Sequence, residues 1–366
     1  MKPLKILFWG RFGNYGPDYP RNRVIIEALE GLGHAVSRFT PRFSPLGDLE
    51  ALVRRLPPCD LLWVPCFRQR DLRAASRYAR RKALPLAFDP LISSFDKQVN
   101  ERSKFAGDSP RGRRLLQWER GLFALPDVVV ADTAGHADYF HEVLGVSPGR
   151  QVVIPVGAEE ELFQHRPLVP KPPGEPLEVL FFGTFIGLHG ISQIIEAIGL
   201  YDGPPVRWRL LGDGPLRPEC ESRVRELLAE RPGLDIAIEG WRPLAELPAR
   251  LAQADAFLGI FGTSDKARRV IPNKVYQGLA IGRPVITAAT PAFSKDLLCN
   301  ETSGLFWCRP GDPADLAAAV ARLVAKRDQL AVLGAEARAT YDSRYSRSMI
   351  QRALIETLNV CFPTAS

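Results

Sequence analysis

The sequence predicts an α/β protein made of two doubly wound parallel sheets, and three observations carry this prediction. Short apolar runs that suit buried strands alternate with helical patterns along most of the 366 residues. The alternation is interrupted once, at the Pro-rich and aperiodic residues 165–176, and then starts again. The length suits two domains of roughly 150–200 residues. Such alternation is typical of parallel sheets that helices cover on both faces.

The first domain is expected to span residues 1–168. The apolar run in MKPLKILFWG is too short for a signal peptide and stops at a glycine, so it is interpreted as a buried strand. The first helix is expected to end at Gly33, because glycine commonly terminates helices. The predicted strands are Lys5–Trp9, Ala35–Phe39, Leu61–Val64, Leu86–Phe88 and Val128–Ala131, and the predicted helices are Arg21–Leu32, Leu72–Lys82, Arg113–Phe123 and Ala134–Leu144.

The second domain is expected to span residues 169–345, where the same alternation resumes. Two helices without a strand between them close the chain, and the last of these lies within residues 346–366. The predicted strands are Val179–Phe182, Arg207–Leu211, Asp235–Glu239, Ala256–Ile260 and Val285–Thr287, and the predicted helices are Ile191–Leu200, Glu219–Glu230, Leu244–Ala252, Pro313–Lys326, Gln329–Thr340 and Ser348–Val360.

Composition and charge narrow the class of protein. With 46% hydrophobic and 24% charged residues the chain is typical of a globular protein, and no apolar run approaches the ~20 residues of a membrane span. Residues 1–170 hold 25 Lys and Arg against 19 Asp and Glu, so most of the net charge of +7 lies there. We expect an anionic partner for this half, either a membrane surface or a phosphate-bearing acceptor. Nucleic acid is not expected, because no binding motif or aromatic-interleaved basic stripe is present.

The six cysteines are scattered and include no C-x-x-C pair. Disulfide or metal frameworks need tighter, repeated spacing, so reduced thiols and a cytoplasmic location are expected. The sequence also lacks H-E-x-x-H and a strand-end D-x-D motif, so no metal or other cofactor is expected.

The most informative segment is IPNKVYQGLAIGRPVIT, which begins at Ile271. A polar stretch with a lysine leads into a short helical pattern, then a Gly-x-Pro turn, then a β-branched run that suits a buried strand. A helix N-terminus with Lys274 beside it would bind phosphate, since its free N–H groups and its dipole favour an anion. The alternative is an ordinary helix whose lysine is solvated.

This segment resembles the donor-site motif of the retaining group-1 glycosyltransferases. The matching residues are Ala280, Gly282, Pro284, Val285 and Ile286, and Gln277 stands where that family usually has glutamate. The resemblance extends along nearly the whole chain. It implies the GT-B fold, in which two Rossmann-like domains face each other across a cleft, and it implies that the last helix, within residues 346–366, packs back onto the first domain.

In that family, three strand-end loops lie beside the donor. The first, GRFGNYG from Gly10 to Gly16, supplies Gly13 and Asn14. The second, after Phe182, supplies Gly183, Thr184 and His189, where the family often has Arg and Lys instead of the last two. The third and the helix after it supply Lys266, Arg269, Asn273, Lys274 and Gln277. The cations of the third loop would replace those missing from the second, and the alternative is a solvated run of charge.

Asp89 follows the strand Leu86–Phe88, at a position where the family often has His or Asp near the reacting sugar. The resemblance therefore implies a catalytic role, as a group that orients the acceptor hydroxyl or accepts its proton. The alternative is that Asp89 caps the turn before Pro90. Asp132 and His136 form a similar strand-end, helix-start pattern that can serve as a helix cap.

By resemblance, the protein would transfer a sugar, with retention, from a nucleoside diphosphate sugar held by the second domain to an acceptor hydroxyl at the first. The expected acceptor is a saccharide or lipid-linked saccharide of cell-envelope polysaccharide or glycolipid synthesis, at the inner face of the membrane. The basic helical faces at Arg68–Lys82 and Arg102–Arg120 suggest this membrane association, and the alternative is that these faces are solvated. Two alternatives stay open: a GT-B nucleotide-sugar epimerase, and a degenerate domain that binds nucleotide without turnover.

Overall fold

The computed structural model describes residues 2–10, 19–102, 104–300 and 302–362. It divides into two compact units, which are considered separately here. Unit 1 comprises residues 1–157 together with 347–366, and unit 2 comprises residues 158–346. Each unit contains a six-stranded sheet whose strands all run parallel, as the sequence predicts.

The sheet of unit 1 has the strand order β2-β1-β3-β4-β5-β6. Its strands are β1 (Lys5–Trp9), β2 (Ala35–Phe39), β3 (Leu61–Val64), β4 (Leu86–Phe88), β5 (Val128–Ala131) and β6 (Gln151–Val153). Its helices are α1 (Pro20–Gly31), α2 (Gly47–Val53), α3 (Leu72–Lys82), α4 (Pro110–Phe123), α5 (Ala134–Glu142) and α13 (Arg347–Cys361), with short turns η1 (Ser44–Leu46), η2 (Asp96–Glu101) and η3 (Pro148–Arg150).

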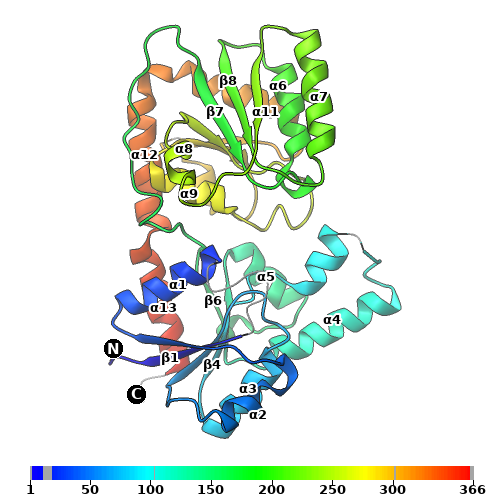
Figure 1. Cartoon of the computed structure of the whole chain (residues 1–366), viewed down its shortest axis with the longest axis vertical. Helices are drawn as coiled ribbons and strands as arrows, with labels where there is room; N and C mark the ends of the chain where they lie inside the picture. The colour runs from blue at the N-terminus through cyan, green and yellow to red at the C-terminus, as the bar shows by residue number, and fades with distance from the viewer. Residues whose placement is uncertain (1, 11–18, 103, 301, 363–366) are drawn as a thin grey trace. The chain divides into compact units, whose positions relative to one another are not determined.

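Alternation along the strands creates two cores in unit 1. Leu7 and Trp9 of β1 pack toward α3, whereas Ile6 and Phe8 pack on the opposite face with α1 and α13. In Figure 1, α1 and α13 lie on one face of the sheet and α3 on the other. Because successive side chains of a strand point to opposite faces, a strand buried on both faces must be apolar throughout. This explains why these short runs are recognisable in the sequence.

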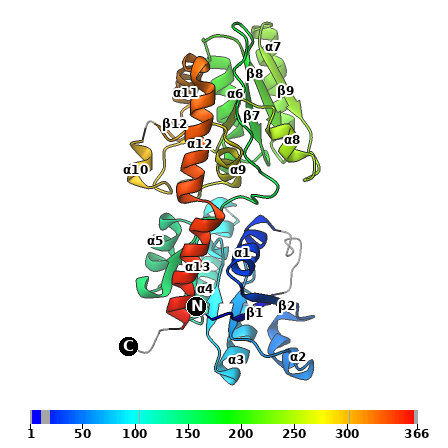
Figure 2. The same ribbon diagram turned by 90° about the vertical axis from the view of Figure 1, so that its left-hand side faces the viewer.

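The last helix of the chain, α13, belongs to unit 1 although it follows unit 2 in the sequence. Its residues Ile350, Leu354 and Leu358 recur every four positions and are buried in the core beside α1. Arg347 donates to Glu27 of α1 over 2.8 Å. Figure 2 shows α13 lying along the first part of the chain, beside α1.

The sheet of unit 2 has the strand order β12-β11-β10-β7-β8-β9. Successive strands are added outward from β7 on one side and outward from β10 on the other, so the strand order reverses between these two parallel strands. Its strands are β7 (Leu177–Phe182), β8 (Val206–Leu211), β9 (Asp235–Glu239), β10 (Ala256–Leu258), β11 (Val285–Ala288) and β12 (Leu305–Cys308). Its helices are α6 (Ile191–Leu200), α7 (Arg217–Glu230), α8 (Leu247–Leu251), α9 (Asn273–Ile281), α10 (Lys295–Leu298), α11 (Pro313–Ala325) and α12 (Leu330–Arg344), with short turns η4 (Gly187–His189) and η5 (Arg327–Gln329).

The boundary between the units lies at Gly157 and Ala158, before the predicted boundary at residue 168. The first part of the Pro-rich segment is attached to unit 2 by specific contacts. The Arg166 amide donates to the Ile281 carbonyl over 2.9 Å, and Leu168 is buried in the core of unit 2. The predicted boundary was based on composition, and composition does not show that the start of the Pro-rich segment packs against unit 2.

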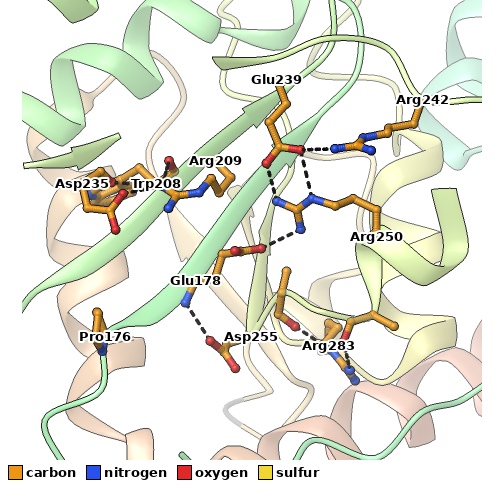
Figure 3. A network of polar contacts seen from close by, with 12 residues as sticks. Pro176, Glu178, Trp208, Arg209, Asp235, Glu239, Arg242, Arg250, Asp255 and Arg283 are labelled. Carbon is orange, nitrogen blue, oxygen red and sulfur yellow. Dashed lines mark hydrogen bonds and ion pairs between the residues drawn. The ribbon is translucent and has the colours of Figure 1, made fainter. Parts of the chain in front are cut away.

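Arg283 fastens this segment through its guanidinium, which is almost fully buried. It donates to the carbonyls of Ala254 and Ala252 over 2.8 and 2.7 Å, and to that of Arg166. Figure 3 shows it close to a second group of charges, in which Arg250 joins Glu178 of β7 to Glu239 of β9. Arg283 thus joins the Pro-rich segment to the residues before β10, and Arg250 joins β7 to β9.

We expect Arg283→Met to destabilise unit 2 by about 3 kcal/mol or more, because several buried carbonyls would lose a charged donor. Hydrogen exchange of unit 2 peptides, followed by mass spectrometry, measures this loss of stability. Arg309→Met is the matched control, since the Arg309 side chain is 75% exposed and its ion pairs lie at the surface. Equal exchange in the two variants would show that Arg283 does not fasten the segment.

Three further findings concern the described residues. None of their helices has both the length and the apolar character that crossing a bilayer requires. No three of their His, Cys, Asp and Glu side chains come together as a metal site would need. The six cysteines are free thiols, and Cys299 among them is exposed.

Candidate functional site

Unit 2 gathers the predicted donor residues where its strand order reverses. The loop after β7 and the segment between β10 and α9 both leave the carboxyl edge of the sheet, and β7 and β10 are neighbours. In open parallel sheets this reversal point is where ligands bind. The helix α9 begins at Asn273, directly after Pro272, and ends at Gly282 in the left-handed conformation with φ 84°. The predicted helix, its start and its glycine end are therefore present.

Lys274 in the first turn of α9 is buried, with 4% of its surface exposed. Its Nζ has no hydrogen-bond partner among the described residues and lies 3.8 Å from the centre of the Phe181 ring. Burial lowers the pKa of Lys274 well below its ordinary value. An unpaired ammonium group is costly to bury, so such a group is expected where an anionic ligand completes it.

Gly183, the first residue after β7, lies directly against this lysine. A Cβ at Gly183 would lie 3.0 Å from Lys274 Nζ, and the φ angle of 143° also favours glycine. The glycine thus leaves the backbone at the end of β7 open beside the ammonium group. A side chain here would crowd the position from which a ligand reaches Lys274.

His189 borders the same space. Its Nδ1 lies 2.6 Å from the Thr184 carbonyl oxygen, which can only accept, so Nδ1 carries the proton. Burial, and then the nearby Lys274, lower the pKa of His189 to about 3. The ring is therefore neutral, and its Nε2 is an acceptor. The His189 carbonyl accepts from the Phe261 amide over 3.1 Å, which joins this loop to the segment after β10.

The remaining predicted donor residues of unit 2 lie around this centre. Lys266 is buried and close enough to contribute to the lowered pKa of His189. Gln277 is buried one turn after Lys274 on the same helix, and Asn273 is half-buried at the helix start. Arg269 is half-buried on the preceding segment. Gly13 and Asn14 lie outside the described residues.

This geometry predicts that phosphate binding is coupled to proton uptake. A phosphate oxygen can accept a hydrogen bond from His189 Nε2 only when this atom is protonated, and Lys274 Nζ offers a phosphate a full positive charge only as the ammonium. A bound diphosphate favours the charged form of both and raises their pKa values, so the complex holds more protons than the free protein. Affinity for a nucleoside diphosphate should therefore rise as the pH falls below 10.5, the ordinary pKa of lysine.

Calorimetry in two buffers that differ in ionisation enthalpy measures this uptake directly. The apparent binding enthalpies should differ between the buffers, and the difference should shrink in His189→Asn. Equal enthalpies for the unchanged protein would contradict the coupling.

Asp89, the predicted catalytic residue of unit 1, is 2% exposed and forms a buried ion pair. Its Oδ2 accepts from Arg21 Nε over 2.8 Å, and Arg21 also donates to the Ile154 carbonyl over 2.9 Å. Burial raises the pKa of Asp89, and the nearby Asp132 adds to this, against the opposing effect of Arg21. The pair joins the start of α1 to the ends of β4 and β6. This gives Asp89 a structural role, and its part in transfer stays a prediction.

Sequence reasoning interpreted Asp132 and His136 as a helix cap, and the structure adds an interaction between them. The Thr133 hydroxyl caps α5 by accepting from the His136 amide over 3.1 Å. The His136 Nδ1 bonds to Asp132 Oδ1, while its buried Nε2 has no partner among the described residues. The two residues are four positions apart, and Asp132 lies just before the cap of α5.

Two family models match the chain. "Glycosyl transferase 4-like domain" matches residues 36–157, and "Glycosyl transferases group 1" matches residues 176–326. The two matches fall in the two units, and the second contains the site around Lys274.

The chain is also similar to individual proteins. "Probable glycosyltransferase WbjE" of Pseudomonas aeruginosa is 29% identical over 174 residues, which are 45% of this chain and 40% of that protein. Alr3699/HepE of Anabaena, solved in complex with UDP, has a TM-score of 0.71 at 17% identity, covering 97% of this chain and 99% of that one. A glycosyltransferase of Rickettsia africae has a TM-score of 0.71 at 15% identity, with both chains covered completely.

Proposed function

Because the chain belongs to the group-1 glycosyltransferases and has the GT-B fold, we propose that it transfers a sugar from a nucleoside diphosphate sugar to an acceptor hydroxyl. We propose that the anomeric configuration is retained and that the sugar is a hexose. The single observation that carries the proposal is the buried Lys274, which has no hydrogen-bond partner among the described residues and lies at the start of α9 beside Gly183. A diphosphate supplies the charge and the acceptor oxygens that this lysine lacks.

The site can stabilise a departing diphosphate without a metal ion. The N–H groups at the start of α9 and the helix dipole favour negative charge there, and Lys274 and Lys266 add cations. Donors held in place before the reaction stabilise charge as it develops on the leaving group. Gly183 allows the phosphates to approach the backbone, and Gln277 can bind ribose hydroxyls through its amide. No cofactor is therefore included in the proposal.

We assign the acceptor to unit 1, at the carboxyl edge of its sheet. The excess of Lys and Arg in the first 170 residues supports an anionic or membrane-held acceptor. The acceptor class we propose is a saccharide or lipid-linked saccharide of cell-envelope polysaccharide or glycolipid synthesis. The enzyme would act in the cytoplasm, as a peripheral protein at the inner face of the membrane.

The test is incubation of the protein with a panel of nucleotide sugars and saccharide acceptors, followed by chromatography. The expected result is free nucleoside diphosphate together with a glycosylated acceptor. The transferred sugar should have the same anomeric configuration in this product as in the donor. An epimerised donor without release of nucleotide would favour the epimerase. Tight binding of nucleotide with neither product would favour a degenerate site, an outcome that makes His189 worth testing, since it is neutral at a position where the family often has a cation.

A further inference from the structure

Unit 1 contains a groove of about 1110 Å³ on the side of the sheet where α3 packs. Its walls come from the segments that follow β2, β3 and β4 and from α4. Arg68 lines it, and a Cβ at Gly10, directly after β1, would lie 2.8 Å from Arg68 Cγ. The groove therefore reaches the carboxyl edge of the sheet, where we place the acceptor hydroxyl.

The lining of the groove is strongly cationic. Arg68, Arg70, Arg73 and Arg77 line it, and Asp71, the acidic residue among the lining side chains, is buried. The structure gives Arg70 and Arg73 exposed side chains and, among the described residues, no ion pair. Guanidinium groups suit phosphate because their planar N–H donors match its oxygens.

One of these arginines, Arg77, has a structural role in the wall of the groove. Arg77 donates to both carboxylate oxygens of Asp48 over 2.6 and 3.1 Å, and Arg81 donates to the same carboxylate over 2.9 Å. Asp48 is buried at the start of α2, so these bonds hold α2 against α3. Arg70 and Arg73 have no such ion pair among the described residues and are available to bind a ligand.

Aromatic and apolar side chains continue from this groove onto α2. Trp118 lines the groove and is half-buried, and Phe43 lines it with 57% of its surface exposed. Leu46, Leu49 and Val53 follow Phe43 at helical spacing and are exposed by 52%, 48% and 83%. An exposed apolar helix face of this kind, beside a groove, is typical of a surface that binds a protein partner or a membrane.

The charge around this face favours an anionic lipid surface as its partner. Residues 38–82 contain 11 Lys and Arg and 4 Asp and Glu. Two of these acids are already paired, Asp48 with Arg77 and Arg81, and Glu50 with Arg54. Apolar side chains ringed by cations bind at the interface of membranes that carry negative lipids.

We propose that this groove binds the phosphate or diphosphate group of a lipid-carried saccharide, while the apolar face of α2 lies in the anionic membrane that holds this lipid. The proposal rests on the proposed function, because it identifies the acceptor of the same reaction. The arginines bind the phosphate, the aromatic side chains contact the sugar or the first lipid units, and the acceptor hydroxyl extends toward the sheet edge.

Vesicle sedimentation without any donor tests the site. Three vesicle types are used: phosphatidylcholine alone, phosphatidylcholine with phosphatidylglycerol, and phosphatidylcholine with a polyprenyl diphosphate at equal surface charge. The unchanged protein should bind the diphosphate vesicles about tenfold more tightly than the phosphatidylglycerol vesicles, since a diphosphate presents more charged acceptor oxygens to the two arginines than a phosphodiester does. Equal binding to both would show a general electrostatic surface and overturn the site.

Paired variants assign the effect to residues. Arg70→Gln with Arg73→Gln should remove the tenfold preference, whereas Arg80→Gln with Lys82→Gln removes the same charge from α3 outside the groove and should keep it. A preference that both pairs keep, or that both lose, would overturn the assignment.

A second comparison tests the apolar face and the lipid source. Leu49→Ser with Val53→Ser should reduce binding to all charged vesicles, while Leu200→Ser with Val332→Ser, exposed apolar residues of unit 2, should not. If the Arg70 and Arg73 variant instead lost affinity only for soluble glucose 1-phosphate and bound vesicles normally, the anion would be soluble and the lipid proposal would fail. These binding readouts need no turnover, so they can fail or succeed independently of sugar transfer.

Discussion

Replacing Lys274 with methionine should weaken nucleoside diphosphate binding and at the same time make the free protein more stable. Affinity should fall by about 1.5–3 kcal/mol, which is roughly 10- to 150-fold, because a charged donor to phosphate is lost. The free energy of unfolding should rise by about 1 kcal/mol, because a buried amine without a hydrogen-bond partner is replaced by an apolar chain of similar length. Calorimetric titration and thermal unfolding measure the two effects.

Lys326→Met is the matched control for this experiment. Lys326 also lies over a phenylalanine ring, that of Phe306, at 5.9 Å, but it is exposed at the end of α11. Its replacement should change neither quantity by more than about 0.5 kcal/mol. A Lys274 variant that loses stability and keeps its affinity would show that the lysine is a structural residue.

The second large effect is expected from Asp89→Asn, which should destabilise unit 1 by about 3–5 kcal/mol. The substitution leaves the Arg21 guanidinium fully buried without its counter-charge, and breaking a buried pair on one side is far more costly than breaking an exposed pair. Hydrogen exchange of peptides from β4 and α1 should speed up, while peptides from unit 2 should exchange as before.

Asp296→Asn is the control for that variant, because Asp296 pairs with Arg344 at the surface and is 65% exposed. It should change stability by less than about 1 kcal/mol. If Asp89→Asn stays folded and loses turnover 10²–10⁴-fold with unchanged donor affinity, the carboxylate is catalytic, as the resemblance implied. Normal exchange together with normal transfer would remove Asp89 from both roles.

Sequence patterns located the strands well where both faces are buried. The range Leu61–Val64 was predicted as observed because every residue in it is apolar and buried. The strand β6, Gln151–Val153, was missed because it is a short edge strand that is only partly buried and begins with a polar residue. The helix α2 was missed because Leu49 and Val53 point outward, which hides the amphipathic pattern.

The candidate site shows a similar division. The helix start at Lys274 and its glycine end were readable from local spacing, since both depend on neighbouring residues. The burial of Lys274 was not readable, because it depends on Phe181 and Gly183, which join α9 only in the folded sheet. The pairing of Asp89 with Arg21, 68 positions away, is likewise a product of strand order.

The structure of the protein with a bound nucleoside diphosphate tests the central claim most directly. Crystals soaked with UDP or GDP should show the diphosphate at the start of α9, with its oxygens accepting hydrogen bonds from Lys274 Nζ and lying beside Gly183. The His189 ring should then present a protonated Nε2 toward the phosphate. A nucleotide bound away from α9, with Lys274 still buried and unpaired, would contradict the assignment of this site to the sugar donor.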